Sequence, residues 1–241
     1  MFGRRNIATL VAEFLGTGAL TLLVLSVQRS TIGVPFFVAA AAGLIVALMS
    51  FALAGASGAY FNPAITLGMW TARKIATIKA VAYIAAQLLG ALAASALYVY
   101  LVNNKLQQVG GHYTGRILTA EAVGTGIFGF AFAAVSIQGF SRAVSASFVG
   151  LGLMLGIIAA SPAAIGLLNP AVALGAHAWV WGTYVLGPVL GAVIGINLYG
   201  MLFAAPEKLV VAASTSSTNI GVGAVVKKAV GKKKTAKKSK K

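Results

Sequence analysis

The segment NPAITLG at residues 62–68 returns as NPAVALG at residues 169–175, an offset of 107. Asn before Pro is typical of a helix start, because Asn is a preferred N-cap and Pro fits the first helical position, where its missing N–H would have no partner. The apolar runs that follow, near residues 62–72 and 169–178, would form only about 15 Å of helix each. The motif therefore predicts two short helices at equivalent places in a repeated chain.

The chain as a whole is strongly apolar. Hydrophobic residues make up 59% of its 241 positions and charged residues 9%, against about 45–50% and about 25% in soluble domains. Such a chain cannot cover its surface with polar groups, so lipid is the expected solvent. The sequence has no cysteine, which excludes a disulfide framework and a Cys-based metal or redox site. It shows no carboxylate pair, nucleophile constellation or metal cluster, so neither an enzyme nor a cofactor site is predicted.

Six apolar stretches are long enough to cross about 30 Å of hydrocarbon as helices. They lie near residues 7–27, 34–54, 79–102, 117–138, 143–161 and 182–204. Arg4 and Arg5 imitate the start of a secretory signal, but the stretch behind them is of spanning length and contains Glu13, so we interpret it as a retained helix. The two short segments would end in mid-membrane, which is tolerated only beside protein or a water-lined cavity. The prediction is an all-α membrane protein with six transmembrane helices and two re-entrant half-helices.

A second marker repeats in the same order as the first. The segment AEFLGTG at residues 12–18 returns as AEAVGTG at residues 120–126. Each repeat holds three full spans, and because three is odd, the second repeat enters the membrane from the opposite side. Residues 7–102 and 117–204 are thus predicted to form inverted three-span repeats of one channel domain, 7–204. Inverted repeats with broken helices at their interface are typical of a solute path.

The distribution of Lys and Arg predicts the orientation. With the N-terminus inside, only Arg29, Lys105 and Arg116 fall outside, which agrees with the positive-inside rule. Residues 1–6 and 205–241 are then cytoplasmic ends of a multi-pass protein of the plasma or inner cell membrane. Nine of the 19 Lys and Arg lie in residues 227–241, in a tail whose composition predicts disorder. Because the tail lacks aromatic residues for stacking, we expect it to contact anionic lipid and not nucleic acid.

With its paired motif in inverted repeats, the chain resembles the major intrinsic protein family, the aquaporins and glycerol facilitators, over roughly residues 7–204. The resemblance implies a passive channel for water or another small uncharged solute, assembled as a homotetramer with one pore in each protomer. It implies that Glu13 and Glu121, which are costly inside a span, accept hydrogen bonds from the motif loops. At the pore centre, side-chain amides would donate to the solute while two helix dipoles oppose cations. The residues at this centre would be Asn62, Pro63, Ala64, Asn169, Pro170 and Ala171.

Counting from the two motifs locates the family's outer selectivity filter at Ala42, Ile157, Gly166 and Val172. Water channels of the family usually carry Phe at the first position and often His at the second, and nearly all members carry Arg at the last. All four residues are small or apolar here, and no Arg or Lys occurs between Arg142 and Lys208. We therefore expect a wider, less polar constriction, in which cation and proton exclusion rests on the central dipoles.

The sequence leaves the solute open. Ala173 and His177 stand where glycerol facilitators usually carry Asp and a basic residue, and Tyr184-Val185 matches neither the water-channel nor the glycerol-channel pair. A channel mainly for glycerol, ammonia or another small neutral solute is the alternative to a water channel. A coupled transporter would need ionisable groups for a coupling ion, and Glu13 and Glu121 suit a structural pair better.

Overall fold

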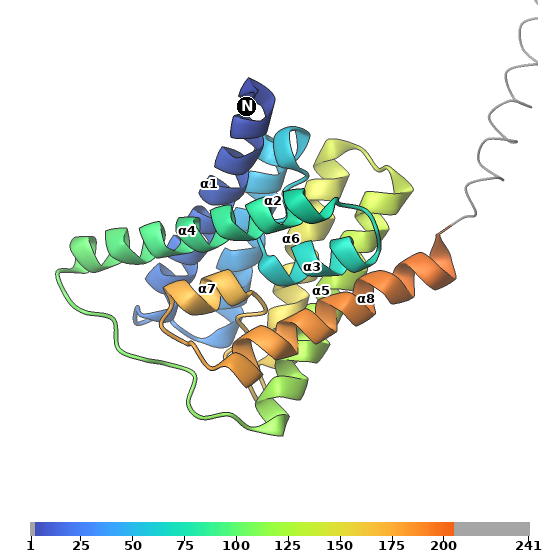
Figure 1. The fold of residues 1–241 in the computed structure, drawn as a ribbon. Helices are drawn as coiled ribbons and strands as arrows, with labels where there is room; N and C mark the ends of the chain where they lie inside the picture. Colours follow the sequence, from blue (N-terminus) through green and yellow to red (C-terminus); the bar gives the residue numbers. More distant parts are fainter. Residues whose placement is uncertain (1–2, 205–241) are drawn as a thin grey trace, which may run out of the picture. The chain divides into compact units, whose positions relative to one another are not determined.

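The computed structural model describes residues 3–204; every regular element in this part of the chain is a helix, and the longest connection is the loop at residues 103–114 (Figure 1). Six of its segments are long and apolar enough to span a membrane, which confirms the predicted fold class. They are α1 (Arg4–Gln28), α2 (Pro35–Ser57), α4 (Thr77–Val102), α5 (Gly115–Gln138), α6 (Arg142–Ala160) and Trp181–Phe203, in which a π-helical stretch, η1 (Trp181–Leu186), continues as α8 (Gly187–Phe203). The predictions for residues 205–241 fall outside the described residues.

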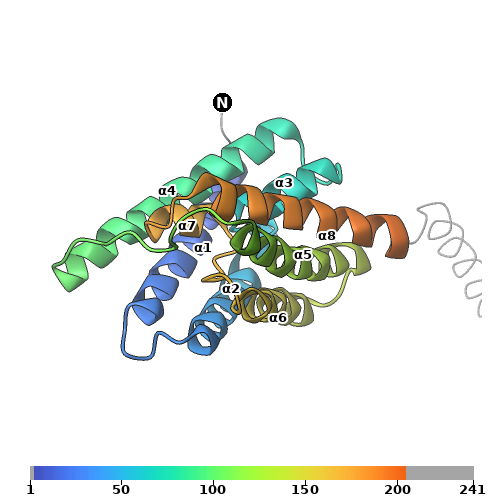
Figure 2. The same cartoon turned by 90° about the horizontal axis from the view of Figure 1, so that it is seen from below.

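Two short helices, α3 (Pro63–Thr71) and α7 (Pro170–Gly175), lie among the long ones (Figures 1 and 2). Their nine and six residues correspond to about 14 and about 9 Å of helix, too little to cross a membrane. The first agrees with the predicted segment. The second ends earlier than expected, because Ala176 caps it and His177 follows in the left-handed region with a φ of 59°.

Contacts between the two repeats follow a twofold axis. Gly43 of α2 and Gly150 of α6 stand 107 positions apart, the offset of the motif. A Cβ on Gly43 would lie 2.7 Å from the Gly150 carbonyl oxygen, and a Cβ on Gly150 would lie 2.3 Å from that of Gly43. Reciprocal contact between equivalent residues is what a twofold axis produces. Helices α2 and α6 therefore pack across the axis that relates the inverted repeats.

Within each repeat, glycine lets the first and third spans cross closely. A Cβ on Gly90 of α4 would come within 2.2 Å of the Phe14 carbonyl oxygen of α1. A Cβ on Gly191 of α8 would come within 2.1 Å of the Ala122 carbonyl oxygen of α5. Small residues at such crossings are typical of helix packing in lipid. There the hydrophobic effect does not drive helices together, and close packing of their backbones stabilises the pair instead. The same kind of glycine contact therefore joins the first and third spans in both repeats.

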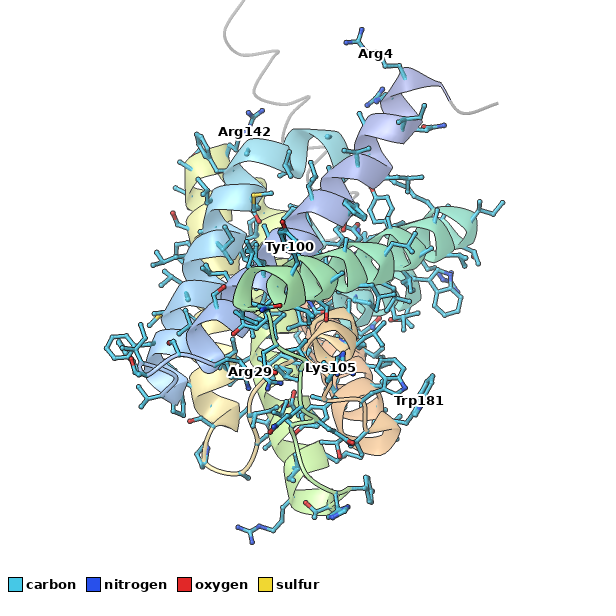
Figure 3. The ribbon with its side chains drawn as sticks, turned by 90° about the vertical axis from the view of Figure 1, so that its left-hand side faces the viewer. Arg4, Arg29, Tyr100, Lys105, Arg142 and Trp181 are labelled. Atoms are coloured by element: carbon cyan, nitrogen blue, oxygen red, sulfur yellow. The ribbon has the colours of Figure 1, made fainter. Side chains whose placement is uncertain are left out.

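The outer surface of the bundle is apolar, and its charges lie at the two ends. Large hydrophobic side chains point outward along the spans, among them Leu44, with 71% of its surface exposed, and Ile194, with 62%. Figure 3 shows Arg4 and Arg142 at one end of the bundle and Arg29 and Lys105 well away from that end, in the other half. An apolar belt between charged ends matches a lipid environment.

Candidate functional site

Two crossed hydrogen bonds join the motif loops. The side-chain amide of Asn62 donates from Nδ2 to the carbonyl oxygen of Leu168 at 2.8 Å, and that of Asn169 donates to the carbonyl oxygen of Phe61 at 2.9 Å. Each acceptor is the residue that precedes the other Asn, so the pair of bonds is again reciprocal. The N-termini of α3 and α7 are thereby held against each other, and their positive dipole ends meet there.

The same two Asn side chains also cap the short helices. Asn62 Oδ1 accepts from the N–H of Ala64 at 2.8 Å, and Asn169 Oδ1 accepts from the N–H groups of Ala171 and Val172 at 3.0 and 3.3 Å. A side-chain amide offers two N–H donors, and the structure gives one of them to the opposite loop. The other is the group that each Asn could offer to a solute.

Glu13 of α1 holds the first motif loop. The residue is completely buried, and its carboxyl oxygens accept from the N–H groups of Tyr60 and Phe61 at 3.1 and 2.7 Å. Gln87 of α4 adds a third donor, with Nε2 2.8 Å from Glu13 Oε2, and also donates to Thr66 Oγ1 at 2.9 Å. A polar network of α1, α3 and α4 thus lies behind the first loop.

Glu121 of α5 holds the second loop with fewer partners. It is also completely buried, and it accepts from the N–H groups of Leu167 and Leu168 at 3.1 and 2.8 Å. The 107-residue offset takes Thr66 to Ala173, and the 101-residue offset that relates Leu89-Gly90-Ala91 to Leu190-Gly191-Ala192 takes Gln87 to Pro188; neither counterpart can extend the network. The carboxyl group is repeated, but its polar support is not.

The backbone before each Asn adopts the same uncommon conformation. Ala59 and Phe61 have φ of 56° and 50°, and Gly166 and Leu168 have 67° and 53°. Positive φ is rare for residues with a side chain and persists where the surroundings fix it. Phe61 and Leu168 are fixed on both sides, because a Glu accepts from each N–H and an Asn donates to each carbonyl.

The four residues predicted for the outer filter are all buried. Ala42, Ile157 and Val172 are 0%, 3% and 1% exposed and belong to one apolar cluster. Gly166 lies against Ile157, since a Cβ on it would come within 3.0 Å of Ile157 Cγ2. The structure thus brings Gly166 and Ile157 into contact and presents only apolar side chains at these positions.

A tie at the outer end was not predicted from the sequence. Arg29, at the end of α1, donates from Nη2 to the carbonyl oxygens of Gln107 at 2.8 Å and Ala176 at 3.3 Å, and the Val109 N–H donates to the His177 carbonyl oxygen at 3.2 Å. The loop between α4 and α5 is therefore fastened to the C-terminal end of α7, near the Arg29 that Figure 3 labels. No local pattern could reveal it, because Arg29 and Ala176 lie 147 positions apart.

Six spans in inverted repeats, with two capped half-helices joined at crossed amides, define a membrane channel of the paired half-helix class. The comparisons agree. The sequence profile of the family described as Major intrinsic protein (MIP) matches residues 4–199. Aquaporin PIP1-3 of Arabidopsis thaliana is 33% identical, over 80% of this chain and 77% of that protein. Glycerol uptake facilitator protein-like 6 of Lactiplantibacillus plantarum is 31% identical, over 76% of this chain and 93% of that protein.

The chain belongs to the major intrinsic protein family. The X-ray structure of the aquaglyceroporin from Plasmodium falciparum has the same fold, with a TM-score of 0.69 at 23% identity over 81% of this chain and 96% of that one. The protein is therefore a multi-pass membrane channel for small solutes of the water and glycerol type, and not an enzyme.

Proposed function

We propose that a small uncharged solute crosses passively between the N-termini of α3 and α7, beside Asn62 and Asn169. The crossed amide bonds carry this proposal, because they hold both side chains at one level with an N–H left for the solute. Two helix N-termini at that level oppose a cation by their dipoles. Glu13 and Glu121 act here by position, since each satisfies the loop N–H groups that a membrane interior would otherwise leave unpaired.

At the outer side, Ala42, Ile157, Gly166 and Val172 would form an apolar constriction without a cation. Their burial and the contact of Gly166 with Ile157 support this placement. A constriction without hydrogen-bonding side chains favours solutes that carry apolar surface over those that must stay fully hydrated. The names of the relatives include both aquaporins and a glycerol facilitator, so water and glycerol are the two solutes to compare first, with ammonia as the third.

The proposed setting is a cell membrane with both termini in the cytoplasm and four copies of the chain together. The charges at the two ends of the bundle support the orientation. The tetramer rests on family resemblance, and contact of the Lys-rich tail with anionic lipid rests on composition.

Permeability of reconstituted vesicles to water, glycerol and ammonia, measured by stopped-flow, tests the proposal. We expect the wild-type protein to exceed empty vesicles for at least one of these solutes without any ion gradient. Val172→Arg should then lower proton and cation leak, because it puts a fixed positive charge into the constriction. Dependence of solute flux on an ion gradient would instead support a coupled transporter.

A further inference from the structure

A cavity with basic walls lies between α1 and α4, where both helices begin. It has a volume of about 440 Å³ and is lined by residues in the first two turns of each helix. They include Arg5, Asn6 and Thr9 of α1 and Lys79 and Tyr83 of α4. Since a water molecule occupies about 30 Å³ in the liquid, the cavity has room for a polyatomic ion or for the headgroup of a lipid.

The two cations of this cavity have no anionic partner within residues 3–204. The side chains of Arg5 and Lys79 make no hydrogen bond or ion pair in that part of the chain. The sequence has only three acidic residues. Glu13 and Glu121 are completely buried and accept hydrogen bonds from the motif loops, and Glu207 lies outside the described residues. The two positive charges are therefore available to an anionic ligand.

The polar groups in the walls are mainly donors. Lys79 Nζ lies 5.1 Å from the centre of the Tyr83 ring, a cation–π contact that keeps the ammonium group beside the wall. Asn6 adds an exposed side-chain amide, whereas the Thr9 hydroxyl already donates to the Arg5 carbonyl oxygen at 2.9 Å. Neither α1 nor α4 has an acidic residue in its first turn, so the positive ends of two helix dipoles also lie here uncompensated. Positive charge and N–H donors therefore dominate the cavity.

The second repeat shows that the fold does not require these two cations. The 108-residue offset that relates AEFLGTG to AEAVGTG takes Arg5 to Tyr113, and the 101-residue offset takes Lys79 to Val180. The first and third spans of the second repeat thus cross in the same way without a cation at either position. The positive-inside rule requires positive charge at the cytoplasmic end of a span, but it does not require a cavity between two charges. The placement of this pair therefore points to a ligand.

We propose that this cavity binds a phosphate group, with Arg5 and Lys79 as its cationic partners and Asn6 as a neutral donor. A guanidinium group fits two phosphate oxygens at once, and an ammonium group acts as a compact charge. The cavity lies at the end of the bundle where Figure 3 labels Arg4, and Ile78, next to Lys79, is 86% exposed. Two sources present a phosphate group at this level, the headgroup of an anionic lipid and a soluble phosphate ester. The proposal does not depend on the path of the solute.

The test titrates the full chain in a neutral detergent with dioctanoyl phosphatidylglycerol, glycerol phosphate and dioctanoyl phosphatidylcholine. The dissociation constant of each probe is obtained from the rise in unfolding temperature. Arg5→Gln/Lys79→Gln should weaken binding of phosphatidylglycerol by at least about tenfold, the size of one charge-assisted hydrogen bond. The matched control, Arg4→Gln/Lys74→Gln, removes the same charge from exposed positions outside the cavity lining and should keep the constant within about twofold.

The outcomes separate the two sources from a failure of the proposal. Binding of phosphatidylglycerol alone identifies a lipid headgroup, and equally tight binding of glycerol phosphate identifies a soluble ester; either result supports the site. Equal weakening in both double variants, equally tight binding of phosphatidylcholine, or no binding of either anionic probe to the wild type overturns it. Both variants keep the Lys-rich tail and the same net charge, so contact of the tail with lipid cannot produce a difference between them.

Discussion

The two motif loops share their backbone geometry and differ in the side chains behind it. Both have a Glu that accepts from two successive N–H groups, a positive φ three residues and one residue before the Asn, and an Asn that donates to the other loop. Only the first loop has the Gln87 and Thr66 network, and its half-helix is longer, with nine residues against six.

The difference shows which features the twofold relation must keep. Backbone groups at the middle of a membrane have no water to satisfy them, so both repeats need a carboxyl group and a crossed amide there. The side chains beyond that level face different surroundings, and they have diverged. The two repeats therefore keep the same side chains where backbone groups need hydrogen-bond partners. Their side chains differ where they contact a solute or a supporting helix.

Replacing each Glu by Met should produce the largest effects and should separate the repeats. Glu13→Met leaves three donors without an acceptor and Glu121→Met leaves two, at a cost of about 1–3 kcal/mol for each buried donor. Unfolding in detergent, followed by circular dichroism against temperature, measures the loss, and Glu13→Met should unfold at the lower temperature. Equal or greater damage from Glu121→Met would mean that Gln87 contributes nothing to the first loop.

Ala59 and Gly166 occupy the position three residues before each Asn, and putting the residue of one repeat into the other should have a smaller effect on stability. The change in stability should have opposite signs in the two repeats. Gly166→Ala combines a φ of 67° with a Cβ 3.0 Å from Ile157 Cγ2, so we expect it to destabilise the protein by about 2 kcal/mol. Ala59→Gly relieves a φ of 56° and should be neutral or slightly stabilising, by less than about 1 kcal/mol. The same detergent unfolding assay applies, and a stabilising Gly166→Ala would show that the second loop is not fixed as the structure has it.

Removing the side-chain hydrogen bonds of Thr66 and Gln87, which the second loop lacks, should have the smallest effect on stability. Thr66→Ala copies the Ala173 of repeat two, and Gln87→Leu removes both donations of that side chain. We expect about 1 kcal/mol for Gln87→Leu and less for Thr66→Ala. A double-mutant cycle should find the two changes coupled, since Gln87 donates to Thr66. Strict additivity would argue against the network.

The sequence predicted those features that rest on local signals or on the repeat. Asn-Pro pairs predicted where α3 and α7 begin, and apolar length predicted the six spans. The sequence did not predict where α7 ends, because the backbone of His177 adopts the left-handed conformation although the residue is not a glycine. The hydrogen bonds of Arg29 join residues that lie far apart in the sequence, so no local sequence pattern could predict them.

The central claim, that solute passes along the apolar outer residues and between the two Asn side chains, is tested most directly by one engineered cysteine. The chain has no cysteine of its own, so Val172→Cys supplies a single thiol. Solute flux into vesicles is measured before and after Hg²⁺ is added outside, with Trp181→Cys, at a 66% exposed position, as the control. We predict that Hg²⁺ blocks flux through Val172→Cys, that excess thiol restores it, and that the control conducts throughout. Unchanged flux through Val172→Cys, or equal block of the control, would contradict the proposed path.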